Sequence, residues 1–340
     1  MTKPIIAIAA MQLVENKKID LDDPITKFLP EFLDLKVMKN QNGEIDDIEN
    51  LQIIPTIKNL LLHTAGFSYN FLSDPLGKYY DKIKLFNSTT TSLEEEVLML
   101  SKAPLLFQPS SQWRYSVSMD VLARIIEVIE KDDLQNILNN KIFIPLKMDN
   151  TNFCISKKSS DRLMKSYEFD PLHLKLTGHI VDNQKIANYG YPLHEKKYAR
   201  GGHGLFSTLS DYSKFARMLH TGKSLQNKLI IKKETLDKMI TNHLGAKFFP
   251  IEIISVGMNN DKNYINDLEP YGWGLGFRTL LKPNINQNLG SKGEFGWSGA
   301  ASTYFLVDNS KNMSAVLMTQ VLGGDPNLKK DFYKFLYTNF

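Results

Sequence analysis

The chain begins Met1-Thr2-Lys3-Pro4-Ile5-Ile6-Ala7, and this stretch contains the strongest indications of the fold. Pro4 suits the first turn of a helix, because the N–H that proline lacks would have no intrahelical partner there. Apolar residues then recur at helical spacing, which predicts a buried helix from Pro4 to about Asn16. The helix dipole and burial both disfavour a cation here, so Lys3 is expected to have a lowered pKa and to act as a base. The alternative is an exposed lysine at a frayed chain end.

Composition limits the classes of protein that the sequence can encode. Its 340 residues, 42% hydrophobic and 11% aromatic, suffice for one large domain or two closely packed ones. The net charge is only +4 with acids and bases mixed, so no nucleic-acid surface is expected. No apolar run reaches about 18 residues, so no spanning helix is expected, and no signal peptide is visible. The single cysteine, Cys154, excludes an intrachain disulfide.

Helix signals dominate the chain up to about residue 220. Thr56 is expected to cap a helix, with Gly66 as the left-handed residue after its end. The polar residues 36–50 are expected to form a surface loop. Further helices are predicted to begin near Ser92, after Tyr115 and near Thr208.

From Tyr271 onward the apolar pattern changes to a period of two. Residues 271–277, 302–307 and 314–319 are predicted to be strands, with a hairpin turn at 308–312. Asp325-Pro326 is expected to cap a closing helix. Helices, then an antiparallel meander, then a last helix indicate an α+β architecture.

The start of the chain resembles a known family. Met1-Thr2-Lys3-Pro4, with Met11-Gln12-Leu13-Val14-Glu15 and Leu21-Asp22-Asp23-Pro24 after it, is similar to the Ser-x-x-Lys helix of the serine β-lactamase-like superfamily. That superfamily includes class C β-lactamases, penicillin-binding DD-peptidases and family VIII carboxylesterases. Its motif is commonly Ser-Met-Thr-Lys-Pro, with the serine as nucleophile. The resemblance therefore implies a sequence truncated just after the nucleophile, whose position would fall one place before Met1.

A second motif resembles the same superfamily. Tyr115-Ser116-Val117 precedes an amphipathic helix, as does the family's Tyr-x-Asn motif and its esterase-like variant Tyr-Ser-x. Beside a cationic lysine a phenol ionises more easily, so Tyr115 suits a general base or a proton shuttle. Val117 stands where the motif has asparagine, which disfavours recognition of a β-lactam amide. The alternative is a core tyrosine at the head of a helix.

The third motif is Gly293-Glu294-Phe295-Gly296-Trp297-Ser298-Gly299-Ala300. It resembles the strand that carries Lys-Thr-Gly or His-Thr-Gly in the family, and its Gly296-Trp297-Ser298-Gly299 is similar to the Trp-x-Gly variant of family VIII esterases. The glycines would let a substrate carbonyl approach the strand, whose N–H groups can form half of an oxyanion hole. The alternatives are a glycine-rich bend and a Gly-x-Ser-x-Gly nucleophile elbow. The elbow is disfavoured because a strand, not a helix, is predicted after it.

Weaker matches follow in the family's order: His63-Thr64-Ala65-Gly66, the segment 201–208, Tyr271-Gly272-Trp273-Gly274 and Gln320. Together they imply a β-lactamase/transpeptidase-like fold in one domain, residues 1–340. A helical region at about 20–200 would be inserted between the site motifs, and an antiparallel sheet with its closing helix would occupy about 265–340. The family's two N-terminal strands would be missing, so residues 314–320 are expected to form an exposed sheet edge, which is an aggregation risk.

The resemblance implies a serine hydrolase that forms an acyl-enzyme with a small-molecule ester or amide, with an esterase favoured over a β-lactamase. The alternative is an inactive remnant or a binding protein on the same scaffold. Complete family members are often exported. No metal or other cofactor is expected, because the segment 194–198, His-Glu-Lys-Lys-Tyr, lacks the second histidine of a zinc motif. The expected catalytic residues are Lys3 and Tyr115, and the expected substrate-binding residues are Ser116, Val117, Gly296, Trp297, Ser298 and Gly299.

Overall fold

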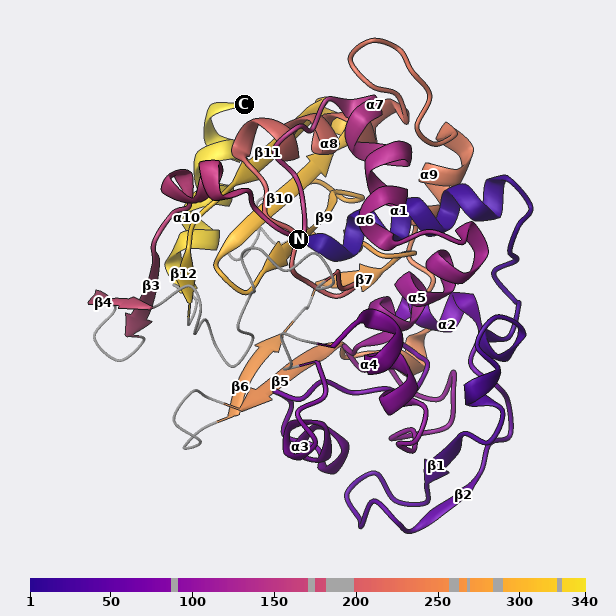
Figure 1. Cartoon of the computed structure of the whole chain (residues 1–340). Helices are drawn as coiled ribbons and strands as arrows, with labels where there is room; N and C mark the ends of the chain where they lie inside the picture. The colour runs from indigo at the N-terminus through magenta and orange to yellow at the C-terminus, as the bar shows by residue number, and fades with distance from the viewer. Residues whose placement is uncertain are drawn as a thin grey trace.

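A buried N-terminal helix, the helices around it and a five-stranded sheet form the main body of the structure (Figure 1). The structure is a computed structural model that describes residues 1–86, 91–170, 175–181, 199–256, 263–267, 270–283, 290–322 and 326–340. The order of elements, helices first and then an antiparallel sheet followed by a last helix, confirms the predicted α+β class.

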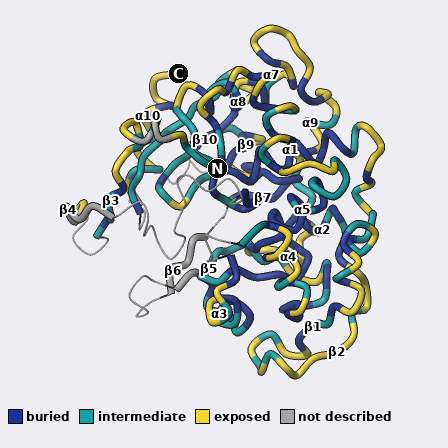
Figure 2. Tube along the Cα trace, viewed as in Figure 1, coloured by how far each residue is buried: buried dark blue, intermediate teal, exposed yellow. Residues whose placement is uncertain are grey.

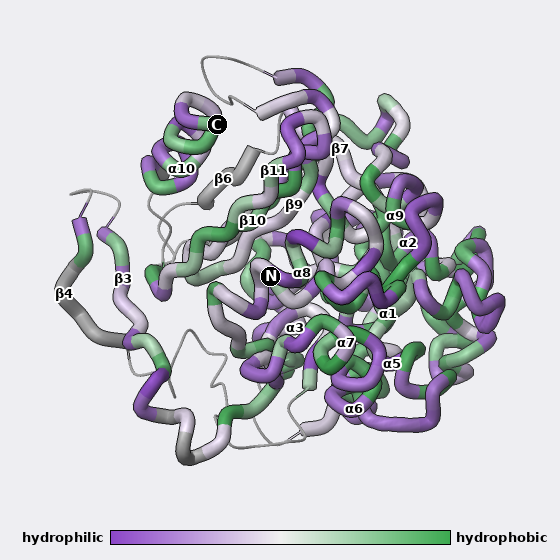
Figure 3. Tube along the Cα trace, turned by 90° about the horizontal axis from the view of Figure 1, so that it is seen from above, coloured by the Kyte–Doolittle hydropathy of each residue, from purple (hydrophilic) through white to green (hydrophobic). Residues whose placement is uncertain are grey.

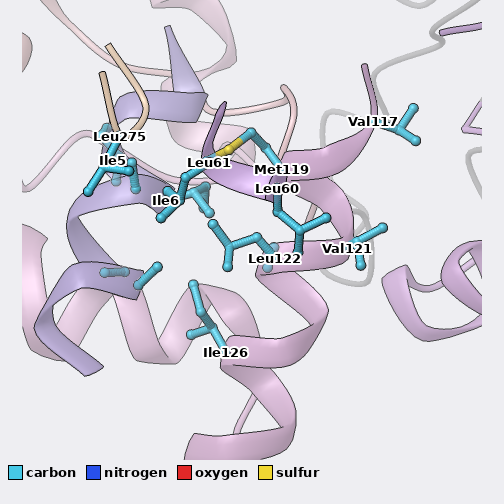
Figure 4. Close-up of a cluster of buried hydrophobic side chains, with 14 of the residues drawn as sticks. Ile5, Ile6, Leu60, Leu61, Val117, Met119, Val121, Leu122, Ile126 and Leu275 are labelled. Atoms are coloured by element: carbon cyan, nitrogen blue, oxygen red, sulfur yellow. The ribbon is translucent and has the colours of Figure 1, made fainter. Parts of the chain in front are cut away.

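Helix α1, Thr2–Glu15, is the core of the helical part. Every residue from Thr2 to Leu13 is buried, as the dark tube in Figure 2 shows, so the start of the chain is held inside the protein and not frayed. Apolar side chains of α1 meet those of α2, Ile57–Leu62, and α5, Ser118–Glu130, in one cluster (Figure 4). Gly276, with a φ of +93°, approaches α1 so closely that a Cβ there would lie 2.3 Å from the Cβ of Ala7.

Helix caps follow the sequence signals, with one correction. Thr56 and Ser92 form capping boxes with Asn59 and Glu95. The predicted left-handed end of α2 at Gly66 was wrong, because His63 takes that conformation, with φ 56° and ψ 36°. Gly66, three residues later, also has a positive φ of 96°, and a Cβ there would lie 2.4 Å from a backbone oxygen in the 105–107 segment. Helix α8, Leu209–Thr221, is capped by Thr208 as predicted, and it ends at the left-handed Gly222.

The sheet is an antiparallel meander in the order β11-β10-β9-β8-β7. Its central strands pair in a register that places Phe305 opposite Trp297 and Leu306 opposite Gly296. The predicted edge position of residues 314–320 agrees with the place of β11 in this order, and its five residues are half-buried. The strands are β7 Tyr271–Trp273, β8 Arg278–Leu280, β9 Phe295–Gly299, β10 Thr303–Asp308 and β11 Met313–Leu317.

The two faces of the sheet are covered differently. Phe305 on the inner face packs against Tyr212 and Phe215 of α8. On the outer face lies α10, Pro326–Asn339, separated from the bulk of the helices by the sheet, as Figure 3 shows from above. A small apolar cluster joins this helix to the sheet through Leu306, Tyr333 and Leu336. The predicted cap residue Asp325 lies outside the described residues.

Several sequence predictions of local structure were wrong. The expected loop at 36–50 contains an antiparallel hairpin of β1, Lys36–Met38, and β2, Ile48–Asn50, whose strands are too short to show a period. The first predicted strand of the sheet ends at Trp273 and turns at Gly276. The region expected to be helical, about 20–200, also holds the strands β3, Ser166–Asp170, and β4, Lys175–Val181, and β12, Val321–Leu322, pairs with β3 in parallel.

The remaining elements lie around this framework. Strands β5, Glu252–Val256, and β6, Asn263–Asp267, form a separate antiparallel hairpin. The other α-helices are α3 Pro75–Lys82, α4 Leu93–Leu100, α6 Leu134–Leu138, α7 Ile144–Leu146 and α9 Lys233–Ile240.

Candidate active site

Lys3 lies in the first turn of α1 and is only 6% exposed. Its Nζ donates a hydrogen bond of 2.8 Å to the carbonyl oxygen of Gly202. The same ammonium lies over two phenol rings, 4.6 Å from the centre of Tyr115 and 5.0 Å from that of Tyr69. Such placement over aromatic faces stabilises a cation by about 0.5–2 kcal/mol. The frayed-end interpretation is therefore excluded, and Lys3 and Tyr115 meet although they are far apart in sequence.

The start of α1 is fixed by further contacts with the segment after residue 200. Tyr212 of α8 donates a 2.8 Å hydrogen bond to the backbone oxygen of Met1. The N–H of Leu205 donates to the side-chain oxygen of Thr2 at 3.3 Å. These bonds immobilise the residues on both sides of Lys3, so the direction of its side chain is set by the fold.

Tyr115 is half-buried just before α5 and belongs to an aromatic wall. Its ring centre lies 4.9 Å from that of His63 and 5.5 Å from that of Trp297. Trp297 in turn meets Trp273 edge to face at 4.7 Å. Aromatic pairs of this kind add about 0.5–1.5 kcal/mol each beyond the area they bury. The wall therefore gives Tyr115 a rigid setting with apolar surface beside it.

His63 is a member of this wall that the sequence treated only as a turn marker. It is 1% exposed, and its Nδ1 accepts a 3.3 Å hydrogen bond from the backbone N–H of Ser116. Burial, with a smaller contribution from Lys3, holds the pKa of His63 well below 6.5, so the ring is neutral near pH 7. The sequence analysis expected the left-handed residue after α2 to be Gly66, whereas His63 takes that conformation.

Ser116 and Val117 lie at the buried start of α5, each 1% exposed. The Oγ of Ser116 lies 2.8 Å from the Oγ of Ser118. The N–H of Val117 donates to the oxygen of Ser68 at 3.1 Å, and its side chain joins the apolar cluster of Figure 4. The structure thus places both residues where they hold Tyr115 in position. Their direct contact with substrate stays a prediction.

Strand β9 brings the third motif to the start of α1. A Cβ on Gly299 would lie 3.2 Å from the backbone nitrogen of Met1, and one on Gly296 would lie 2.2 Å from a backbone oxygen of β10. Trp297, 5% exposed, points to the inner face, and Ser298 is half-buried opposite Tyr304. Because β10 follows this strand directly, the nucleophile-elbow interpretation is excluded.

Glu294, which stands in the slot of the family's cationic triplet, faces away from Lys3. It is fully buried toward α10, where Tyr333 donates a 2.8 Å hydrogen bond to Oε1 and Arg278 lies 3.8 Å away. The triplet position therefore places no cation on the inner face of β9.

The segment 201–202 was a supporting match in the sequence and is part of the site in the structure. The N–H of Gly202 donates a 2.9 Å hydrogen bond to Asp120, while its oxygen accepts from Lys3. A side chain at Gly202 would overlap Tyr69 and Asp120, at 2.4 and 2.5 Å from its Cβ. Glycine is required here because the Tyr69 hydroxyl and the Asp120 carboxylate occupy the space that a Cβ would need.

Two global features complete the description. Within the described ranges, no group of three or more His, Cys, Asp or Glu side chains is arranged to hold a metal ion. The segment 194–198, with its incomplete zinc motif, lies outside those ranges. Across the same described residues, every helix is too short or too polar to span a bilayer.

Several known proteins are similar to this chain over nearly its whole length. Protein Rv1367c of Mycobacterium tuberculosis is 27% identical, with 97% of this chain and 81% of that protein covered. Lovastatin esterase of Penicillium rubens is 25% identical, with 100% and 84% covered. Among solved structures, EstCE1, a hydrolase with promiscuous acyltransferase activity, matches with a TM-score of 0.76 at 22% identity, covering 99% of this chain and 83% of that one.

The structural match supports the β-lactamase/transpeptidase-like fold predicted from the motifs. The sequence model described as Beta-lactamase matches residues 1–338, which is nearly the whole chain. This chain is therefore a member of the β-lactamase family.

Proposed function

We propose that this protein belongs to the esterase branch of its family and acts on small-molecule carboxylic esters through an acyl-serine intermediate. The single observation that carries the proposal is the meeting of Lys3 with Tyr115, 4.6 Å from nitrogen to ring centre, beside β9. A base and a phenol in one partly water-excluded place are what proton removal from a hydroxyl nucleophile needs. Lovastatin esterase and esterase EstB, relatives by sequence, carry esterase names.

Each step has a residue assigned to it. The serine Oγ attacks the ester carbonyl while its proton passes to Tyr115, beside the ammonium of Lys3, and N–H groups of β9 near Gly299 stabilise the developing oxyanion. Tyr115 delivers a proton to the departing alcohol as the C–O bond breaks. Water then attacks the acyl carbonyl and gives a proton to Tyr115. Tyr115 passes that proton to the serine Oγ as the acyl C–O bond breaks and the carboxylic acid leaves.

The wall formed by Tyr115, Trp297 and Trp273 favours an apolar acyl group. Glu294 points to the outer face, so its position supplies no cation to hold the carboxylate of a β-lactam. Val117, in place of the motif's asparagine, also disfavours recognition of a β-lactam amide. Esters are therefore the preferred substrate class.

The nucleophile is assigned to a serine joined to Met1, the residue whose nitrogen lies against β9 beside Gly299. The test compares the chain as printed with the same chain preceded by the residues encoded upstream of Met1. Hydrolysis of p-nitrophenyl butyrate and of nitrocefin is measured for both. We expect ester turnover in the longer chain that Lys3→Met abolishes, with little or no turnover of nitrocefin. Nitrocefin turnover that exceeds ester turnover would refute the esterase assignment.

The second candidate is a catalytically inactive protein that binds small molecules on this scaffold. It is favoured if the codon before Met1 does not encode serine and neither protein turns over either substrate. Binding of a butyrate ester without turnover, measured by the quenching of tryptophan fluorescence in the aromatic wall, would then support this candidate.

A further inference from the structure

We infer that Asp120 is the buried counter-ion of Lys3 and a positioning residue for the proposed site. The pairing is argued from contacts of the fold, in which both side chains bond to Gly202, and only its catalytic meaning rests on the proposed function.

Asp120 lies in the first turn of α5 and is fully buried. Its Oδ1 accepts the N–H of Gly202 at 2.9 Å, and Oδ2 has no hydrogen-bond partner among the residues that the structure describes. A buried carboxylate with an unused oxygen is costly unless an opposite charge lies nearby. A cation close to Asp120 would offset this cost.

Gly202 joins the carboxylate to Lys3. Its N–H faces Asp120 and its oxygen faces the ammonium of Lys3, so one residue holds both charges at fixed places. The crowding at its Cα, where Oδ2 of Asp120 and the hydroxyl of Tyr69 converge, prevents this segment from moving away. Lys3, Asp120 and Tyr69 are thereby locked around one peptide.

The other ionisable side chains near Lys3 are either paired with an opposite charge or neutral near pH 7. Arg200 is fully buried and lies 3.6 Å from Glu96, which is itself 1% exposed. Burial holds the pKa values of His63 and His203 well below 6.5, so both rings are neutral near pH 7. The ionisable groups around Lys3 are the Met1 amino group, whose pKa burial lowers to about 5, His63, Tyr69, Tyr115, Asp120 and His203, with Arg200 beyond them.

Burial raises the pKa of Asp120, and Lys3 is the strongest of the groups that oppose this rise. The charge of Lys3 therefore favours the ionised form of Asp120. For the proposed site, the consequence is that Asp120 holds the ammonium of Lys3 over the ring of Tyr115.

The test measures the pKa of Lys3 directly and needs no turnover. The full chain is labelled with lysine carrying ¹³C at Cε, and the Lys3 resonance is the one missing from Lys3→Met. We expect Asp120→Asn, which keeps the acceptor for Gly202, to lower the pKa of Lys3 by about 1 or more. The matched control is Asp308→Asn, a buried carboxylate that accepts backbone N–H groups far along the chain, and it should leave that pKa unchanged.

An unchanged Lys3 pKa in folded Asp120→Asn would overturn the assignment. If that variant does not fold, the carboxyl carbon of Asp120 is titrated in Lys3→Met, where we expect its pKa to rise by about 1 or more. No rise there would equally refute the pairing. A shifted Lys3 pKa, with no ester hydrolysis by the longer chain that carries the residues encoded upstream of Met1, would support the pairing and reject the proposed function. Ester turnover together with an unchanged Lys3 pKa in Asp120→Asn would support the proposed function and reject the pairing of Asp120 with Lys3.

Discussion

Tyr333→Phe removes one hydroxyl from the polar cluster that fixes α10 to the outer face of the sheet. That hydroxyl donates to Oε1 of Glu294 at 2.8 Å and accepts from Arg278 at 2.5 Å. Burial raises the pKa of Tyr333 well above 10, so it stays a protonated donor at neutral pH. The three side chains are at most 3% exposed, so water cannot replace the lost partner.

The magnitude follows from these contacts. A hydrogen bond to a charged group contributes about 1.5–3 kcal/mol, and a buried group left without its partner loses a similar amount. Glu294 already has a second oxygen without a partner among the described residues, so it can find no substitute nearby. Allowing for non-additivity within one network, we expect Tyr333→Phe to lower the free energy of unfolding by about 2–4 kcal/mol.

The assay is urea denaturation followed by circular dichroism, with the slope m required to match that of the unmutated protein. Tyr337→Phe, four residues further along α10, is the matched control. Its hydroxyl donates at 2.9 Å to Asp308 in a less buried place, so we expect a loss of about 0.5–1.5 kcal/mol. A loss at Tyr333 no larger than the loss at Tyr337 would show that the buried cluster does not stabilise the docking of α10.

Three further predictions concern other parts of the fold. Burial, and to a smaller extent the charge of Arg278, lowers the pKa of Lys329 to about 7. Between pH 7 and pH 10 the unfolded chain therefore binds a proton that the folded chain lacks, so the free energy of unfolding should rise with pH over this range. Lys329→Met should flatten that rise in denaturation curves measured from pH 6 to 9. Gly202→Ala should lower the free energy of unfolding by about 1–3 kcal/mol through overlap, whereas Gly245→Ala, with open space around its Cβ, should change it by less than about 0.5 kcal/mol; equal effects would contradict the crowding argument. Trp297→Ala should cost about 3–5 kcal/mol in thermal or chemical unfolding, and a loss below 1 kcal/mol would mean that the aromatic wall is not packed as described.

The sequence predicted those parts of the fold that have strong local signals. The α1 helix, the caps at Thr56, Ser92 and Thr208, and the meander from Tyr271 follow from residue type and period. The hairpin of β1 and β2 was missed because three-residue strands carry no usable period, and their pairing is a tertiary effect.

The candidate site divides in the same way. Lys3, Tyr115 and Trp297 were found because each lies in a motif with a recognisable chemistry. Asp120 and His63 were missed because their importance comes from burial and from neighbours more than 50 residues away, which no local pattern records. Glu294 was recognised as part of the third motif, but its direction away from Lys3 comes from its tertiary contact with Tyr333 of α10, just before β9 begins.

The bond between Lys3 and Gly202 spans 199 positions of the chain, and the bond between Met1 and Tyr212 spans 211. Contacts of such separation are entropically expensive to close and are typical of slow folding. The first three residues therefore reach their final surroundings only after the polypeptide beyond residue 212 has been synthesised and collapsed. A ribosome-bound fragment that ends before this point would present the apolar N-terminal helix without its partners, which makes it a natural client for chaperones that recognise nascent chains.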